Sequence, residues 1–257
     1  FLSDAADFPG TTAERSADAM NITAEQITVC SRDRLKRVLL SEVSCHFPRG
    51  TVTLLVGPTG AGKTTLLQVL AGLLAPDEGT VRLGDLPLWE NGKLRAELIL
   101  RISLVLQLPE QQLFAETVRD EFHYSLRPCR LTKAEREERI HGALKLFDLP
   151  EDILEQSPLL LSGGQKRKIA LAAALSTRPE WLLLDEPTAG IDADGFRSLL
   201  AFISAWKART SGGMVIATHD PESFLPFTDQ VLCINGGKVT AAFSPAELYA
   251  RPELLCA

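Results

Sequence analysis

Eight residues in the first quarter of the chain have the composition of a phosphate-binding loop. They are Gly57-Pro58-Thr59-Gly60-Ala61-Gly62-Lys63-Thr64, with Thr65 next, and they directly follow the apolar run 51–56. Glycines permit a tight turn whose backbone N–H groups point at phosphate oxygens. Lys63 can then reach the β- and γ-phosphates, and the Thr64 hydroxyl can bind Mg²⁺. A helix beginning at Lys63 would add its positive end to the same site. The alternative is a plain glycine turn with a solvent-facing lysine, which the flanking apolar segments disfavour.

A second glycine pair precedes another expected helix, in the sequence Leu161-Ser162-Gly163-Gly164-Gln165. Ser162 is a good N-cap, and glycines at the next two positions leave backbone amides accessible. This segment is either an ordinary capped helix or a second helix N-terminus that binds an anion. The presence of the first loop favours the second interpretation.

Two carboxylates follow the apolar run 181–184. Asp185 is in a position to hold Mg²⁺, directly or through water. Glu186 is free to orient and polarise an attacking water as a general base. The alternative is a pair of solvated loop acids.

Two further polar residues follow expected strands. His219 comes after the strand 214–218 and is a candidate to contact the γ-phosphate, although a lone histidine at a strand end is more often structural. Gln107 comes after the strand 102–106 and is a candidate to ligate Mg²⁺ or to place the water. Taken alone, a glutamine carries almost no information.

Short apolar runs predict the elements that position these side chains. Near-continuous hydrophobicity is typical of parallel strands that are covered on both faces. The segment 195–210 has helical spacing, and Asn235-Gly236 predicts a hairpin turn. The segment 116–161 is helix-rich, with a capping box at Thr132–Glu135, and predicts an all-helical insertion into one α/β core. The apolar runs are Thr51–Val56, Ile102–Leu106, Trp181–Leu184, Met214–Ala217 and Val231–Ile234.

Composition limits the possible partners of the 257-residue chain. The net charge is −6, from 27 basic and 33 acidic residues, which argues against nucleic acid as a partner. No run reaches the roughly 18 apolar residues of a transmembrane helix. The five cysteines are scattered and never spaced C-x-x-C, so neither a disulfide framework nor a zinc site is expected.

The motifs occur in an order that resembles the nucleotide-binding subunit of an ATP-binding cassette transporter, over about residues 22–245. That order is the phosphate loop 57–65, Gln107, Leu161–Gln165, Asp185-Glu186, Ala189-Gly190-Ile191-Asp192 and His219. The segment Gln107–Phe114, with Thr117–Glu121, is similar to the energy-coupling factor group of vitamin and metal-ion importers.

The resemblance implies a P-loop NTPase core with a mostly parallel sheet, an antiparallel β subdomain and an inserted helical subdomain at about 108–167. Residues 1–21 would form a flexible N-terminal extension and 246–257 a C-terminal helix. ATP and Mg²⁺ are the implied cofactors. Glu186, His219 and Gln107 would be catalytic, and Thr64, Gln107 and Asp185 would contact the metal. Ser162, Gly163, Gly164 and Gln165 would complete the ATP site of a second subunit.

The two phosphate-binding helix starts also have a physical consequence. If the two helix starts point in different directions, one ATP cannot contact both of them within one chain. Each ATP site is then completed only by a second copy or a paralogue that packs head to tail. The γ-phosphate then favours the closed pair of subunits, and its hydrolysis lets the two subunits separate. The resemblance also implies a separate transmembrane subunit, placing the chain peripherally at the cytoplasmic face of the membrane. The segment 107–121 carries Glu110, Glu116, Asp120 and Glu121, and this acidic composition suits a basic helix of that subunit.

One departure from the family concerns the adenine base. The family usually has an aromatic residue about 25 to 30 positions before the phosphate-loop lysine, whereas Ile27–Arg37 contains none. Arg32 or Arg34 is a candidate to stack on adenine instead. Two other interpretations stay open: a cassette ATPase in DNA repair or on ribosomes, and a nucleotide-gated regulatory subunit that barely hydrolyses ATP.

Overall fold

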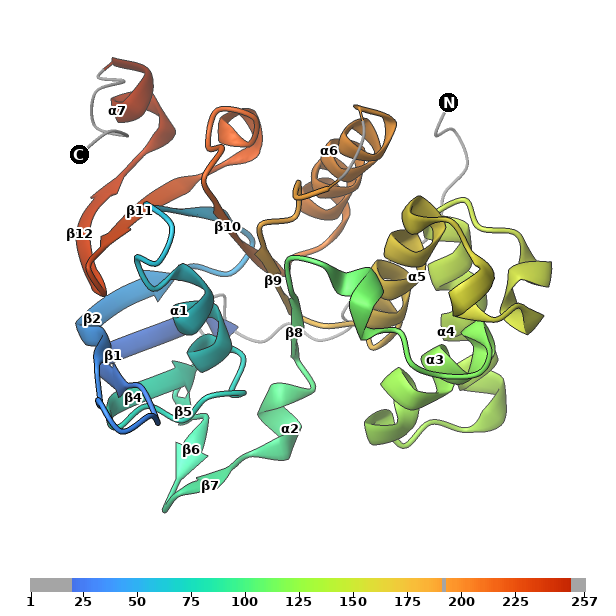
Figure 1. The fold of residues 1–257 in the computed structure, drawn as a ribbon, viewed down its shortest axis with the longest axis horizontal. Coiled ribbons are helices and arrows are strands. Elements are labelled where there is room, and N and C mark those ends of the chain that lie inside the picture. Colours follow the sequence, from blue (N-terminus) through green and yellow to red (C-terminus); the bar gives the residue numbers. More distant parts are fainter. Residues whose placement is uncertain (1–19, 191–192, 251–257) are drawn as a thin grey trace.

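The computed structural model describes residues 20–190 and 193–250, which form two sheets and a group of helices (Figure 1). The larger sheet has six strands, all parallel except the edge strand β12, which pairs antiparallel with β11. In spatial order the strands are β12 (Lys238–Phe243), β11 (Gln230–Asn235), β3 (Val52–Val56), β10 (Gly213–Thr218), β9 (Trp181–Asp185) and β8 (Ile102–Val105).

The central strands are continuously apolar because both of their faces are covered. Every residue of β3, β9 and β10 is buried. Alternate residues enter two different cores, so that Leu183 packs with helix α1 (Lys63–Leu70) and Leu184 packs with helices α5 (Gly163–Ser176) and α6 (Ala193–Arg209). The expected strands and their two-sided burial are therefore confirmed.

The second sheet is antiparallel and packs against the α1 side of the molecule (Figure 1). Its alternation of apolar residues is broken at Gln26 and Glu42, which adopt left-handed backbone conformations with φ of 53° and 52° where the register shifts. The strands, in spatial order, are β2 (Val38–Phe47), β1 (Ile22–Cys30), β4 (Glu78–Leu83) and β5 (Leu86–Pro87). With the parallel sheet, it confirms the expected fold class.

From Pro109 to Ser176 every regular element is helical. The main helices are α3 (Val118–Leu126), α4 (Lys133–Leu146) and α5, joined by the short 3-10 segments η2 (Pro109–Gln112), η3 (Arg127–Cys129), η4 (Glu151–Glu155) and η5 (Pro158–Leu160). They enclose a core of their own around Phe122, Ile140 and Ile169. The expected capping box is present, since Thr132 and Glu135 bond each other's backbone N–H groups.

Smaller elements complete the described chain: β6 (Trp89–Glu90), β7 (Lys93–Leu94), α2 (Ala96–Ile99), η6 (Leu225–Phe227) and α7 (Pro245–Ala250). The hairpin turn at Asn235-Gly236 joins β11 to β12, as expected. Within the described ranges no helix is long and apolar enough to cross a membrane.

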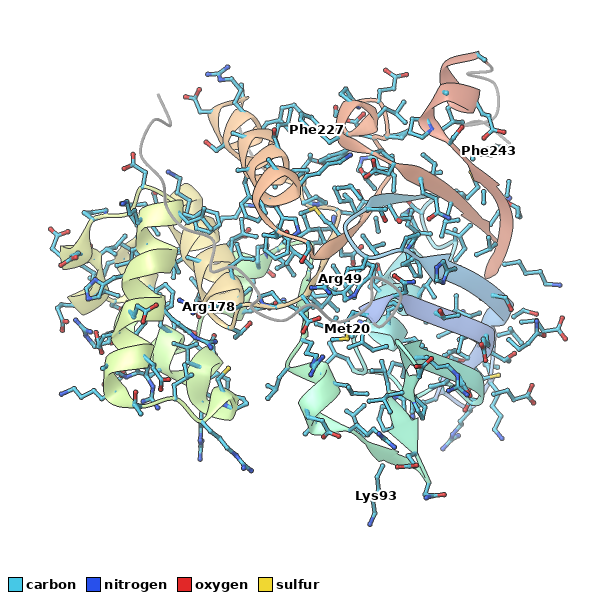
Figure 2. The ribbon with its side chains drawn as sticks, turned by 180° about the vertical axis from the view of Figure 1, so that it is seen from behind. Met20, Arg49, Lys93, Arg178, Phe227 and Phe243 are labelled. Carbon is cyan, nitrogen blue, oxygen red and sulfur yellow. The ribbon has the colours of Figure 1, made fainter. Side chains whose placement is uncertain are left out.

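The two chain ends were expected to be a flexible extension over 1–21 and a helix over 246–257. Residues 1–19 and 251–257 lie outside the described residues. Met20 packs into the fold, and its carbonyl accepts a 2.8 Å hydrogen bond from the indole Nε1 of Trp181 (Figure 2). Asn21 accepts a bond from the backbone N–H of Arg49.

Candidate nucleotide-binding site

Four neighbouring parallel strands end at one edge of the large sheet and place most of the expected site residues there. The phosphate loop follows β3, His219 follows β10, Asp185 ends β9 and Gln107 lies two residues beyond β8. In open α/β sheets, the carboxyl ends of the strands are where ligands bind. The four segments come from distant parts of the sequence and meet because of the strand order.

The phosphate loop needs glycine at two positions for steric reasons. A Cβ on Gly57 would lie 2.0 Å from the carbonyl oxygen of Ile234, and one on Gly62 would lie 2.9 Å from Leu40 Cδ2. Both glycines also have positive φ, 155° and 108°. At Gly60, by contrast, φ is 81° but nothing lies within 4 Å of an added Cβ. The loop is thus packed closely on its inner side and open on the side of Gly60.

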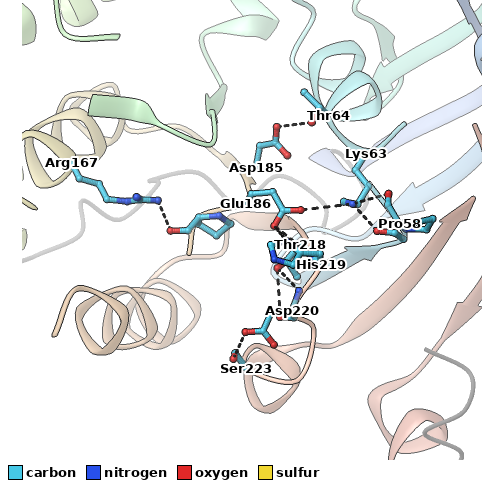
Figure 3. Close-up of polar contacts among 12 residues, drawn as sticks. Pro58, Lys63, Thr64, Arg167, Asp185, Glu186, Thr218, His219, Asp220 and Ser223 are labelled. Atoms are coloured by element: carbon cyan, nitrogen blue, oxygen red, sulfur yellow. Dashed lines mark hydrogen bonds and ion pairs between the residues drawn. The ribbon is translucent and has the colours of Figure 1, made fainter. Parts of the chain in front are cut away.

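Helix α1 begins at Lys63 with Gly62 as its N-cap, and no side chain caps it. The first N–H groups of a helix lack intrahelical partners, so this terminus suits an anion. The side chain of Lys63 folds back over the loop and donates to the carbonyls of Gly57 and Pro58, at 2.7 and 3.2 Å (Figure 3). Its amine is therefore already held at the mouth of the loop.

Asp185 is buried and accepts a 2.8 Å hydrogen bond from the Thr64 hydroxyl through Oδ2. Burial raises the pKa of this carboxyl and the neighbouring Glu186 raises it further, while Thr64 and Lys63 act in the opposite direction. Its other oxygen, Oδ1, is buried and has no hydrogen-bond partner among the described residues. A hydroxyl beside a carboxylate with one unused oxygen is a donor set that fits Mg²⁺.

Glu186 links the phosphate loop to the end of β10. One of its oxygens lies 3.7 Å from the Lys63 amine, and the other lies 2.7 Å from His219 Nδ1 and accepts the His219 backbone N–H (Figure 3). Its backbone is left-handed, with φ of 45°, and its N–H donates to the carbonyl of Ala217. A non-glycine residue held in this region is strained, and such strain clusters at functional sites.

Gln107 lies at the same edge but is not joined to this network. It is exposed, and its side chain makes no hydrogen bond to any described residue. In contrast, Glu186 contacts both Lys63 and His219, and the adjacent Asp185 contacts Thr64.

The second expected half-site lies on the helical part of the chain. Ser162 is the N-cap of α5 and accepts from the Gln165 backbone N–H, while Gln165 Oε1 accepts from the Ser162 N–H. A side chain at Gly163 or Gly164 would meet nothing within 4 Å, so this surface is open. Figure 1 shows α5 and α1 on different parts of the molecule, and no hydrogen bond or ion pair joins 162–165 to the described phosphate loop.

The turn that joins β1 to β2, residues 31–37, contains no aromatic residue that could stack on adenine. Arg32 and Arg34 are exposed in the turn that joins these strands. The large exposed apolar side chains nearby are Leu35, Val38 and Leu39, and the Leu39 carbonyl lies 3.1 Å from the position of a Cβ at Gly62. The turn is therefore near the phosphate loop, but stacking by either arginine stays a prediction.

The expected acidic surface over 107–121 is partly wrong. Glu121 is buried, 4% exposed, because its Oε1 accepts the backbone N–H groups of Phe114 and Ala115. Glu110 is half-buried, and its Oε2 has no hydrogen-bond partner among the described residues. Glu116 and Asp120 remain exposed.

Sequence reasoning also missed Arg167, although it lies two residues after Gln165. Its guanidinium donates to the carbonyl oxygens of Pro187 and, at 2.7 Å, Ala189. These carbonyls lie in the turn that follows Glu186. A lysine- and arginine-rich helix start usually indicates a solvated face, so no sequence signal distinguished Arg167 from Lys166 or Lys168.

The site therefore defines a P-loop nucleotide-binding protein in which the second helix start, that of α5, lies on a different part of the molecule. The family model described as "ABC transporter" matches residues 40–189. An energy-coupling factor transporter ATP-binding protein EcfA2 from Ligilactobacillus salivarius is 37% identical over 227 residues, 86% of this chain and 77% of the relative. The Bacillus subtilis EcfA2 is 33% identical, over 85% of this chain and 80% of the relative.

Solved structures agree with this assignment. CbiO1 from Clostridium perfringens, described as part of the ABC transporter complex cbiONQ, superposes with a TM-score of 0.78 at 29% identity, over 91% of this chain and 92% of that one. A dimeric ATP-binding cassette bound to ADP and phosphate has the same fold, with a TM-score of 0.75 at 23% identity, over 87% and 98% of the two chains. The chain belongs to the ABC transporter family, among the energy-coupling factor ATP-binding proteins. It is an ATPase that uses ATP with Mg²⁺.

Proposed function

We propose that this chain is the ATP-hydrolysing subunit of an energy-coupling factor type importer of vitamins or metal ions. In this proposal it lies peripherally at the cytoplasmic face of the membrane, with a transmembrane subunit and a second ATPase subunit, identical or paralogous, as partners. Residues 22–245 form the cassette, with 108–167 as its helical part. The observation that carries the proposal is that one chain presents two phosphate-binding helix starts that do not face each other.

The phosphate loop and its neighbours bind and cleave the triphosphate. Residues 57–65 surround the phosphates with backbone amides, and Lys63 releases the loop carbonyls to neutralise phosphate charge. Thr64 and Asp185 would hold Mg²⁺, which would neutralise part of the phosphate charge. Gln107 approaches the same metal or the attacking water.

Glu186 acts as the general base in this scheme. Its oxygen lies beside His219 Nδ1 at 2.7 Å, so the imidazole fixes the direction of the carboxylate. The 3.7 Å contact with Lys63 gives the carboxylate a cationic neighbour as well. When Lys63 turns to the phosphates, Glu186 is left to accept a proton from water.

Ser162, Gly163, Gly164 and Gln165 serve the partner subunit's ATP. Ser162 already accepts one backbone N–H as a cap, and the open amides of the α5 N-terminus face outward. Each ATP is thus enclosed by two chains, and its γ-phosphate supplies the differential contact that favours the closed pair. Size-exclusion chromatography of the ATPase subunits with Mg²⁺ and ATP, compared with ADP, tests this step. Dimerisation that does not depend on the γ-phosphate would contradict it.

The transmembrane subunit docks on the segment 107–121 in our proposal. Phe114 and Tyr124 are 66% and 58% exposed and make an edge-to-face contact with ring centroids 4.7 Å apart. Glu116 and Asp120 lie on the same segment and are exposed, so the surface combines an aromatic pair with negative charge. A basic amphipathic helix has the complementary chemistry.

Charge reversal tests this docking surface. Glu116→Lys with Asp120→Lys should abolish copurification with the transmembrane subunit while the ATP affinity of the isolated chain stays unchanged. A matched control is Glu138→Lys, an exposed acid on α4 that pairs only with Arg178 among the described contacts. Intact association of the double variant would exclude docking at this surface.

A further inference from the structure

We propose that Arg167 is a positioning residue that connects the docking segment to the catalytic turn. The proposal rests on the proposed function and adds to it a residue that does not touch nucleotide. Arg167 stands on α5, and its side chain leaves the helical part of the chain to reach the turn after β9 (Figure 3).

Arg167 donates hydrogen bonds to the turn after β9, and this turn also fixes the backbone of Glu186. The Ala189 N–H closes this turn by donating to the Glu186 carbonyl at 3.0 Å, and the Glu186 N–H is held by Ala217. Two carbonyls of the same turn, those of Pro187 and Ala189, both accept from the one guanidinium. Since Glu186 has a left-handed backbone, release of these carbonyls would let the turn relax and displace the carboxylate.

On the side of the docking segment, the connection begins at Glu110, which lies in η2. The segment η2 packs against α5. Burial lowers the pKa of Arg167, and the Glu110 carboxylate acts in the opposite direction. Oε2 of Glu110 is buried without a hydrogen-bond partner among the described residues, and this carboxyl group acts on the guanidinium electrostatically, from farther away than an ion pair. Movement of the docking segment therefore changes the electrostatic environment of Arg167 directly.

Arg167 also lies two residues from Gln165, in the helix that serves the partner subunit's ATP. One side chain thus spans the docking segment, the α5 helix and the turn that carries the general base. A planar guanidinium presents its donors in a rigid fork that can reach two separate carbonyls in a fixed geometry, whereas a lysine ammonium is a point charge on a flexible stem. This geometry explains an arginine at this position and predicts that lysine is a partial replacement.

The test measures ATP hydrolysis by the complete transporter complex carrying Arg167→Ala or Arg167→Lys. We expect Arg167→Ala to lower kcat by up to about 10²-fold, the cost of an ångström-scale misplacement of a catalytic group, with KM for ATP within about twofold of wild type. Arg167→Lys should recover part of kcat. Glu110→Gln should lower the stimulation by the transmembrane subunit more than the basal rate.

A matched control is Arg139→Ala. Arg139 is also a half-buried arginine that donates to a backbone carbonyl, that of Thr177 at the opposite end of α5, and burial lowers its pKa too. Equal losses of kcat in the Arg139 and Arg167 variants, at equal folded fractions, would show a purely structural role and overturn the inference. A fall in ATP affinity alone would also overturn it. If wild-type complex neither binds nor hydrolyses ATP, the proposed function fails instead.

Discussion

The two phosphate-binding regions of this chain differ in how complete they are. The loop 57–65 belongs to a network of mutual contacts in which Lys63, Thr64, Asp185, Glu186 and His219 are already held near one another. At the start of α5, by contrast, Ser162 and Gln165 accept hydrogen bonds from each other's backbone N–H groups, which are local contacts within the helix terminus. The difference indicates that the first region is organised within the chain itself, whereas in our proposal the second becomes functional only against another molecule.

Removing the general base should give the largest effect on the first region. Glu186→Gln keeps the size of the side chain but cannot accept the proton, so we expect hydrolysis to fall roughly 10²–10⁴-fold. ATP-dependent closure should persist, because the γ-phosphate is no longer removed. Turnover assays and size-exclusion chromatography measure the two effects. Normal turnover would remove Glu186 from this role.

Removing the lysine should affect binding rather than turnover. Lys63→Ala deletes a charged donor worth about 1.5–3 kcal/mol, so ATP should bind roughly 10- to 100-fold more weakly in calorimetry with Mg²⁺. The loop carbonyls of Gly57 and Pro58 also lose their donor, and a melting curve should accompany the measurement. Unchanged affinity would argue against the phosphate-loop interpretation.

The chain provides a matched pair for testing the second region. Ser162 and Thr132 are both N-caps in capping boxes, of α5 and α4. Alanine at either position should cost about 0.5–2 kcal/mol of stability. Only Ser162→Ala should also weaken ATP-driven association, by about tenfold if one hydrogen bond to phosphate is lost. Equal effects of the two variants on association would show that Ser162 is only a helix cap.

The sequence predicted the parts of the molecule that depend on local patterns. The phosphate loop, the parallel strands, the capping box at Thr132 and the N-cap at Ser162 follow from spacing and residue type. The strands β1 and β2 were expected only from the family resemblance, since left-handed residues at Gln26 and Glu42 break the alternation that identifies a strand.

Side-chain direction between distant segments was not predictable from the sequence. Glu121 and Asp120 are neighbours in the first turn of α3, yet Asp120 is exposed and Glu121 turns inward to two amides of the preceding loop. Arg167 likewise differs from its basic neighbours only because the turn after β9 lies within its reach. Such roles depend on tertiary contacts that a linear pattern does not contain.

The smallest expected effect concerns Asp185, the proposed metal ligand, and the stability of the fold that its burial costs. Burial raises the pKa of Asp185 above its ordinary value of 3.8, so the native state binds a proton more readily than the unfolded state. Its ionisation therefore costs stability as pH rises from about that ordinary value through the raised pKa of the native state. Asp185→Asn keeps an acceptor for Thr64 and removes this cost, and at neutral pH without nucleotide it should stabilise the fold by about 0.5–2 kcal/mol, as other changes at strained functional sites do.

Denaturation with and without Mg²⁺ and ATP separates this stabilisation from function. The wild-type chain should gain stability when both ligands are added, because the unpaired Oδ1 of Asp185 then has a partner. Asp185→Asn should gain much less, and the advantage of the variant over wild type should shrink as the pH is lowered. A variant that is less stable than wild type in the absence of ligand would mean that the Asp185 carboxylate stabilises the fold itself. The first region would then be structural as well as catalytic, and the contrast with the α5 start would lose its basis.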